Sequence, residues 1–183
     1  MNSLQGHLLV AAPNLIDPNF FRTVILLVQH SSEGALGLVL NRPTQTTIRE
    51  AWQQVGESAC SRDGVLQHGG PCEGPLMVVH NLESAGHAEF LPNLYFSTDK
   101  DEVQQIIARE DGDARFFVGY AGWSAGQLEN ELDTGSWLPT PAGSEHVFHD
   151  DIMLWENAIR AIARRDAFPH LPRKLVPRDP RVN

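Results

Sequence analysis

Residues 116–132 read FFVGYAGWSAGQLENEL, and the hydrophobic period of this stretch changes halfway along. The apolar run over residues 116–121 predicts a buried strand. Glycines interrupt the run, after which Leu128 and Leu132 recur at the spacing of a helical face. The stretch therefore predicts a strand, a tight glycine turn and a helix that begins at Ser124.

Short apolar runs on either side of this stretch predict further strands. Residues 23–30 form a continuous β-branched and apolar run, as expected for a strand that is covered on both faces. A turn signal at residues 31–34 joins this run to the next one and predicts a hairpin. The prolines after Trp137 predict a loop. The remaining predicted strands are residues 6–12, 35–40, 65–68, 76–80 and 91–97.

Capping signals and apolar stripes predict three more helices. Thr47 and Glu50 match a capping box, in which each side chain binds the backbone N–H of the other residue. Asp99 is the N-terminal capping signal of a second helix. A final helix is predicted from about His149, because apolar residues follow at helical spacing. These apolar residues are Ile152, Trp155, Ile159 and Ile162.

The order of these elements indicates the fold class. Strands in hairpins alternate with four helices, which is typical of an α/β or α+β domain with a mixed sheet. The chain has 183 residues, enough for one hydrophobic core, and no second apolar core follows a linker. We expect a single domain over residues 1–168, followed by a flexible Pro/Arg-rich tail over residues 169–183.

The net charge of −9 is unevenly distributed along the chain. Six basic and two acidic residues lie between Arg164 and the C-terminus, so the rest of the chain carries −13. An acidic body repels phosphate backbones, which makes direct nucleic-acid binding unfavourable. No apolar run approaches the roughly 18 residues of a membrane span, and the N-terminus does not resemble a secretory leader. We therefore expect a cytoplasmic protein whose two cysteines are reduced.

Residues 122–126 spell G-x-S-x-G, the pattern of a hydrolase nucleophile on a strand-to-helix turn. A catalytic Ser124 needs a base and a group that orients this base. The candidates for these roles are Asp133, Asp150, Asp151, His146 and His149. A hydrolase of this class spaces its triad over further strands, which this chain lacks. Ser124 and Gln127 also match a Ser-x-x-Gln capping box, and we favour this structural interpretation.

Two further patterns are compatible with bound ions but fit a structural role better. His30, His68 and His80 stand at predicted strand ends, without a short spacing motif for zinc. Residues 69–71, Gly-Gly-Pro, lack the Lys-Ser/Thr of a P-loop and the third glycine of a dinucleotide site. We therefore predict a tight turn at this position and neither a metal nor a cofactor.

Polar residues and glycines near the ends of the apolar strands are the candidates for a binding site, because turns carried by a rigid sheet often hold function. They are Arg22, His30, Asn41, Gly69, Gly70, Trp123, Ser124 and Gln127. On this basis we expect a non-enzymatic protein that acts through a small ligand or a protein partner. A serine hydrolase that uses Ser124 is the alternative.

Several blocks along the chain resemble a known family. The longest are GHLLVAAP at residues 6–13, DPNFFRTV at 17–24, GALGLVLNRP at 34–43 and GYAGWSAGQLENEL at 119–132. Shorter matches are His30, Gly-Gly-Pro at 69–71, His80 and Trp137. Together these blocks resemble the YqgE/AlgH family of bacterial proteins.

The resemblance implies a single α/β domain whose mixed sheet curls toward a pseudo-barrel, with about four flanking helices. It also implies a bacterial, cytoplasmic protein without an established enzymatic activity. Some members are labelled as transcriptional regulators connected with exopolysaccharide production. Because this chain is acidic and lacks a helix-turn-helix pattern, we expect any such regulation to be indirect.

Overall fold

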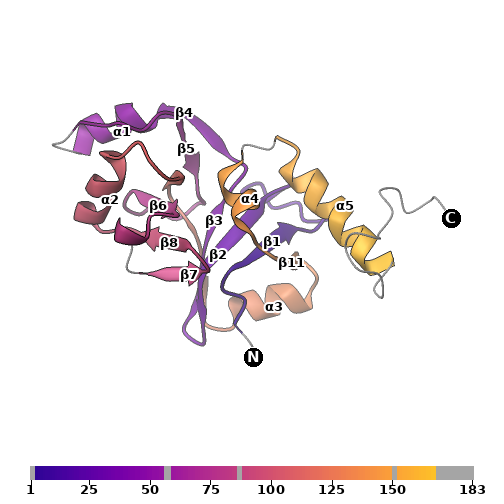
Figure 1. The fold of residues 1–183 in the computed structure, drawn as a ribbon. Helices are drawn as coiled ribbons and strands as arrows, with labels where there is room; N and C mark the ends of the chain where they lie inside the picture. Colours follow the sequence, from indigo (N-terminus) through magenta and orange to yellow (C-terminus); the bar gives the residue numbers. More distant parts are fainter. Residues whose placement is uncertain (1–2, 56–58, 86–87, 150–151, 168–183) are drawn as a thin grey trace.

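Two β-sheets and five α-helices make up the computed structural model, which describes residues 3–55, 59–85, 88–149 and 152–167 (Figure 1). One sheet has five strands and the other has six, and within the described residues the two do not close into one barrel. The predicted single, mixed α/β domain is confirmed, but its strands are divided between two sheets. The predicted tail at 169–183 lies outside the described residues.

The five-stranded sheet is antiparallel and has the order β10-β3-β2-β1-β11. Its strands are β1 (His7–Ala11), β2 (Val24–Ser31), β3 (Gly34–Val39), β10 (Ala121–Ser124) and β11 (Trp137–Pro141). The first five residues of β2 are buried, as predicted for a strand covered on both faces. The loop predicted after Trp137 is wrong. Because β11 is an edge strand, Pro139 and Pro141 can lie in it without leaving a neighbouring carbonyl unpaired.

The six-stranded sheet has the order β4-β5-β9-β6-β8-β7 and is mixed, because β5 and β9 are parallel. Its strands are β4 (Pro43–Thr47), β5 (Val65–His68), β6 (Met77–His80), β7 (Glu89–Leu91), β8 (Leu94–Ser97) and β9 (Ala114–Val118). The single strand predicted over residues 91–97 is wrong. Asn93, with a left-handed φ of 61°, turns the chain between β7 and β8.

Helices α1 (Ile48–Val55) and α2 (Lys100–Ile107) pack on one face of the six-stranded sheet and enclose a hydrophobic cluster with it (Figure 1). Both predicted N-terminal caps are confirmed. Thr47 N donates to Glu50 Oε2 at 2.8 Å, and Glu50 N donates to Thr47 Oγ1 at 3.2 Å. Asp99 accepts hydrogen bonds from the first backbone N–H groups of α2. These local signals work because a cap satisfies donors that the helix itself cannot pair.

Helices α3 (Gln127–Asp133) and α5 (Leu154–Ala167) contact the five-stranded sheet, and α4 (Ser144–Phe148) contacts β9 of the six-stranded sheet. A short 3-10 helix lies at Glu83–Ala85. The final helix begins at Leu154 and not near His149, and the short α4 before it was not predicted. Ile152 is therefore outside the helix and is 96% exposed, whereas Trp155 is buried and donates from Nε1 to Ala11 O at 2.8 Å.

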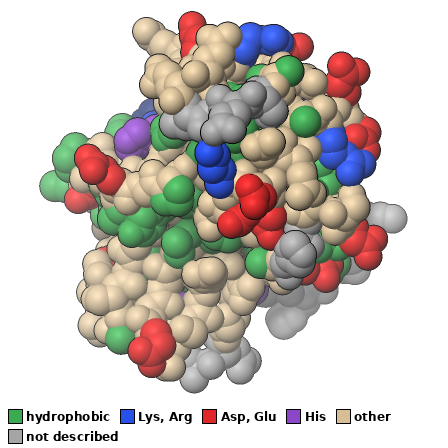
Figure 2. Space-filling model, turned by 90° about the vertical axis from the view of Figure 1, so that its left-hand side faces the viewer, with side chains coloured by type: hydrophobic (Ala, Val, Ile, Leu, Met, Phe, Trp, Pro, Cys, Tyr) green, Lys and Arg blue, Asp and Glu red, His purple; other side chains and the backbone are tan. Residues whose placement is uncertain are grey.

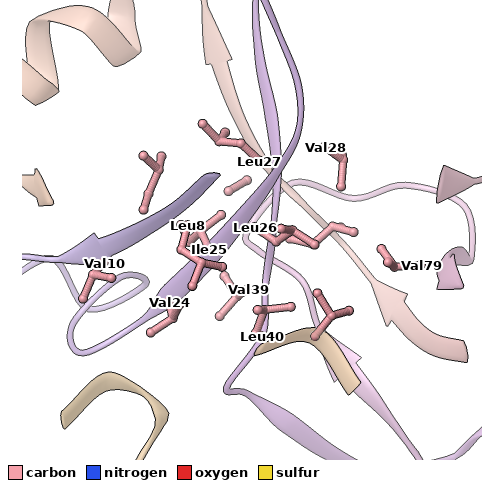
Figure 3. Packing of buried hydrophobic residues seen from close by; sticks show 14 of the residues in the cluster. Leu8, Val10, Val24, Ile25, Leu26, Leu27, Val28, Val39, Leu40 and Val79 are labelled. Atoms are coloured by element: carbon pink, nitrogen blue, oxygen red, sulfur yellow. The ribbon is translucent and has the colours of Figure 1, made fainter. Parts of the chain in front are cut away.

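The main hydrophobic core combines residues of both sheets. Figure 3 shows valine and leucine side chains of β1, β2 and β3 meeting Val79 of β6. Phe117 of β9 and Phe96 of β8 belong to the same cluster. This core holds the two sheets together, because separating them would expose large apolar side chains to water.

The stretch at residues 116–132 departs from its predicted form. Its predicted strand is two strands in different sheets, because Gly119 with a φ of 72° ends β9 and the chain crosses to β10. The helix that follows begins at Gln127, and its N-cap is Gly126 in the left-handed conformation. Ser124 is therefore the last residue of a strand, and the prediction that it begins the helix is wrong.

Gly69 and Gly70 lie at this crossing, where two chain segments touch through their backbones. Gly69 O accepts from Val39 N in β3 and Gly69 N donates to Val118 O, both at 2.8 Å. A Cβ atom on Gly70 would lie 2.2 Å from the carbonyl carbon of Tyr120. The predicted tight turn is thus a backbone junction between the sheets that leaves no room for a side chain.

We predict that Gly70→Ala lowers the free energy of unfolding by more than about 3 kcal/mol, because a methyl group would displace backbone at a φ of 152°. Gly135→Ala is the matched control. Gly135 also has a positive φ, 74°, but a Cβ there meets nothing within 4 Å, so we expect a cost of only about 1 kcal/mol. Urea unfolding of both variants measures the difference, and equal losses would contradict the junction's role.

Candidate functional site

The polar side chains of the G-x-S-x-G turn bind one another. Ser124 donates from its backbone N and from Oγ to Gln127 Oε1, at 3.1 and 3.2 Å. Gln127 Nε2 donates to Glu131 Oε1 at 3.0 Å. Gln127 therefore reaches back to the Ser124 backbone as in a capping box, but the Ser124 hydroxyl does not cap α3. The predicted capping role of Ser124 is wrong, because Gly126 is the N-cap residue.

Glu131 is the centre of this network, and the sequence analysis did not select it. Its Oε2 accepts from the indole Nε1 of Trp123 at 2.9 Å and of Trp137 at 2.7 Å. The two indoles meet edge to face with centroids 6.0 Å apart, and Phe20 packs against both. One carboxylate thus joins α3 to β10 and β11 and satisfies two buried indole donors.

His30 is held by hydrogen bonds on both ring nitrogens, and its side chain is only 5% exposed. Its Nδ1 accepts from Leu4 N at 2.8 Å, so Nε2 carries the proton and donates to Glu129 Oε1 at 2.9 Å. A backbone hydrogen bond at Glu129 and the bond from His30 hold the pKa of this carboxyl below its usual value. His30 therefore has no ring nitrogen left to serve Ser124 as a base.

Arg22 and Asn41 meet at the opposite end of the β2–β3 hairpin. Asn41 Nδ2 donates to Arg22 O at 2.8 Å, and Val24 N donates to Asn41 Oδ1 at 3.0 Å. Arg22 has a left-handed φ of 53°, and its guanidinium lies 5.1 Å from the Phe21 ring centroid and 5.2 Å from that of Trp155. Asn41 has a structural role here, whereas the side chain of Arg22 is 55% exposed.

The predicted site residues thus fall into three groups. His30, Trp123, Ser124 and Gln127 lie around α3 and the tip of the β2–β3 hairpin. Arg22 and Asn41 lie at the other end of β2, whose eight residues span roughly 26 Å. Gly69 and Gly70 form the junction between the sheets. No single cleft contains all of them.

The other two histidines considered for a metal site do not form one with His30. His80 is fully buried in β6 and its Nε2 donates to Ser97 Oγ at 3.0 Å. His68 is exposed at the end of β5. In the part of the chain that the structure describes, no three His, Cys, Asp or Glu side chains group closely enough to hold a metal ion. Nor is any described helix long and apolar enough to cross a membrane.

A pocket of about 140 Å³, which the sequence analysis did not find, opens at the N-terminal ends of β5 and β9, beside the start of α1 and the end of α4. We call it the Gln67 pocket. Gln67 lines it and is only 3% exposed, and its Oε1 has no hydrogen-bond partner in the structure. The residues that line the pocket are Ile48, Asp63, Gly64, Val65, Gln67, Asp113, Ala114, Arg115, Phe116 and Phe148.

Charged groups of both signs border the Gln67 pocket. Arg115 donates to Val147 O of α4 and, at 3.0 Å, to Leu40 O after β3, so its side chain ties α4 to the sheets. Asp63 pairs with Arg49 at 3.2 Å, and Asp113 accepts from Asn81 Nδ2 at 3.0 Å. The wall therefore does not present a single sign of charge, and its buried polar group is a neutral amide.

A family model described as AlgH-like matches residues 8–165. The chain belongs to the AlgH-like family. Its resemblance to YqgE/AlgH proteins is thereby confirmed.

Related bacterial chains are similar to this AlgH-like protein over most of their length. A UPF0301 protein of Chlorobaculum tepidum is 39% identical over 165 residues, or 85% of each chain. A UPF0301 protein of Myxococcus xanthus is 37% identical, over 88% of this chain and 92% of its own. These relatives match most of the AlgH-like chain and not one motif alone.

Two solved structures are similar in fold. The solution structure of the AlgH protein from Pseudomonas aeruginosa has a TM-score of 0.74 and 33% identity, over 88% of this chain and 89% of that one. An X-ray structure of a Corynebacterium diphtheriae protein has a TM-score of 0.65 and 24% identity, over 87% of each chain. The second similarity concerns the fold alone. The AlgH-like fold therefore agrees with an experimentally determined relative.

We predict that Glu131→Ala lowers the free energy of unfolding by about 2–3 kcal/mol, because it leaves the buried indole N–H groups of Trp123 and Trp137 unpaired. Asp133→Ala is the control, since Asp133 is an exposed acidic residue of the same helix, and we expect a change within about 0.5 kcal/mol. Urea unfolding followed by tryptophan fluorescence measures both. A Glu131 variant as stable as the control would contradict the network.

The buried His80 predicts a pH dependence of stability. Desolvation by burial lowers its pKa to about 4, so the native ring stays neutral where the unfolded ring, at about 6.5, takes up a proton. The stability that His80 contributes is present above pH 6.5 and is lost as pH falls toward 4, by up to about 3 kcal/mol. Unfolding free energies of wild type and His80→Gln, measured at pH 7.5 and 4.5, should diverge by this amount. A parallel loss in both would contradict the prediction.

Proposed function

We propose that this AlgH-like protein is a non-enzymatic protein that binds a small molecule in the Gln67 pocket. The observation that carries the proposal is the Gln67 side chain, which is buried beside a preformed pocket and whose Oε1 lacks a partner. Concave sites with a few polar groups among apolar walls are the usual form of small-molecule sites. Phe148 is the partly exposed apolar residue of this lining, whereas Phe116 and Ile48 are almost fully buried behind it.

A buried amide without a partner has a cost that a structural role does not explain. An unpaired buried acceptor destabilises a fold by about 1–3 kcal/mol, and a well-packed apolar side chain in its place would avoid that loss. Each such group in a folded protein therefore needs a reason, and ligand binding is a common one. Because the torsion that rotates a Gln amide is soft, Gln67 can turn its oxygen or its nitrogen toward a molecule in the pocket.

The serine hydrolase alternative has less support from the structure. The hydroxyl of Ser124 donates to Gln127, and both ring nitrogens of His30 are engaged. His146 lies in α4, where its Nδ1 accepts from Gly143 N at 3.0 Å. A triad would need one of these imidazoles beside the Ser124 hydroxyl.

Within this proposal the protein acts in the cytoplasm as a ligand-responsive regulator, and any effect on transcription is indirect. On the face in Figure 2, Asp and Glu side chains are spread around the surface, and Lys and Arg side chains form no continuous basic patch. Non-specific DNA binding depends on such patches. The acidic composition of the chain supports the same conclusion.

The test is a thermal-shift screen of wild type and Gln67→Met against small metabolites. A molecule at about 100 times its dissociation constant should stabilise wild type by roughly 2.7 kcal/mol. Gln67→Met keeps the length of the side chain but removes its polar atoms, so it should not respond. Gln105→Met, on the exposed face of α2, is the matched control and should respond like wild type.

Unliganded Gln67→Met should be at least as stable as wild type, because the variant removes an unpaired buried acceptor. A loss of more than about 1 kcal/mol would indicate a structural role for the amide. A screen without any hit would overturn small-molecule binding and direct attention to a protein partner. Labelling by a fluorophosphonate that disappears in Ser124→Ala would overturn the non-enzymatic assignment in favour of the hydrolase.

A further inference from the structure

The Gln67 pocket also limits the chemistry of what it can hold. Its volume of about 140 Å³ is close to the roughly 150 Å³ of an engineered cavity that holds benzene. A fitting molecule therefore has about six to eight non-hydrogen atoms, in one small ring or a short branched chain. Nucleotides, peptides and lipids are too large to be enclosed in it.

Charge selects against an ion in this pocket. Arg115 lies on one part of the wall, and Asp63 and Asp113 lie on another. Arg115 would repel a cation and Asp113 would repel an anion, so an ion of either sign meets a like charge on the wall. The Asp63 side chain is 93% exposed and adds little. A small ion would in addition lose its hydration in a site where the buried polar group is neutral. An uncharged ligand avoids both costs.

The Gln67 amide determines which hydrogen-bonding groups the ligand needs. The Gln67 amide carries one acceptor oxygen and an NH₂ group with two donor hydrogens, next to each other in one plane. A molecule that only accepts hydrogen bonds, or an apolar molecule, would leave Oε1 unpaired. A ligand with a donor beside an acceptor can form two hydrogen bonds with the amide, one to Oε1 and one from the NH₂ group, as two amides do with each other.

We infer that the Gln67 pocket binds a small uncharged molecule with an amide-type edge, such as a lactam, a primary amide or a urea. This inference rests on the proposed function and adds to it the class of ligand. Phe148 of α4 lies on the wall, is partly exposed and provides apolar contact for the body of such a ring, in front of the almost fully buried Phe116 of β9. Gln67 supplies the specificity, and Phe148 supplies contact area.

The experiment uses three probes of nearly equal size with the ¹⁵N-labelled full chain, followed by amide resonances in solution. 2-Pyrrolidinone carries the donor and the acceptor, cyclopentanone carries only the acceptor, and propionate carries a charge. We expect 2-pyrrolidinone to shift the Gln67 side-chain NH₂ signals and the backbone signals of Gly64 and Ala114. It should bind at least about tenfold more tightly than cyclopentanone or propionate, the equivalent of one lost hydrogen bond.

The variants separate the two proposals. Gln67→Met should abolish the preference for 2-pyrrolidinone, and Gln105→Met should retain it. Equal affinity of wild type for all three probes, still dependent on Gln67, would overturn the amide-edge inference and leave ligand binding in this pocket intact. Binding that Gln67→Met does not change would overturn both. If no probe shifts any pocket resonance, the pocket holds water only, and both are again overturned.

Discussion

The close contact between two glycine-containing backbone segments is the constraint on which the rest of the structure depends. Gly69 and Gly70 touch the chain at Gly119 and Tyr120 without any side chain between them. The contact lets Gly69 bind β3 of one sheet and Val118 of the other. Because backbone can approach backbone this closely only where Cβ is missing, the two sheets join at this point and share one core.

The junction explains how the most distinctive stretch of the chain is packed. After Gly119 the chain enters the five-stranded sheet as β10. Trp123 is buried there, and its indole donor needs a partner. Glu131, one turn into α3, meets this need together with that of Trp137. Packing is a sufficient reason for the small residues at 122–126, since they suit a close turn before a helix.

The Gln67 pocket has a different origin. It lies where the parallel pair β5 and β9 begins, and Phe148 of α4 forms part of its lining. Arg115 holds α4 in this position through backbone carbonyls. By alternation along β5, Gln67 shares a face with the exposed Val65, so its pattern in the sequence indicates a surface residue. Its burial depends on the tertiary structure, and no local pattern encodes it.

From its sequence alone, the protein's mixed α/β class, its buried hairpin and the caps at Thr47 and Asp99 could be derived, because each depends on residues close together in the chain. The tertiary structure decided the rest. It divided the predicted strand at Gly119 between two sheets, made a strand of the proline-rich run after Trp137 and buried Gln67 beside a pocket. These outcomes depend on which distant segments meet, and local spacing carries no information about partners that are tens of residues away.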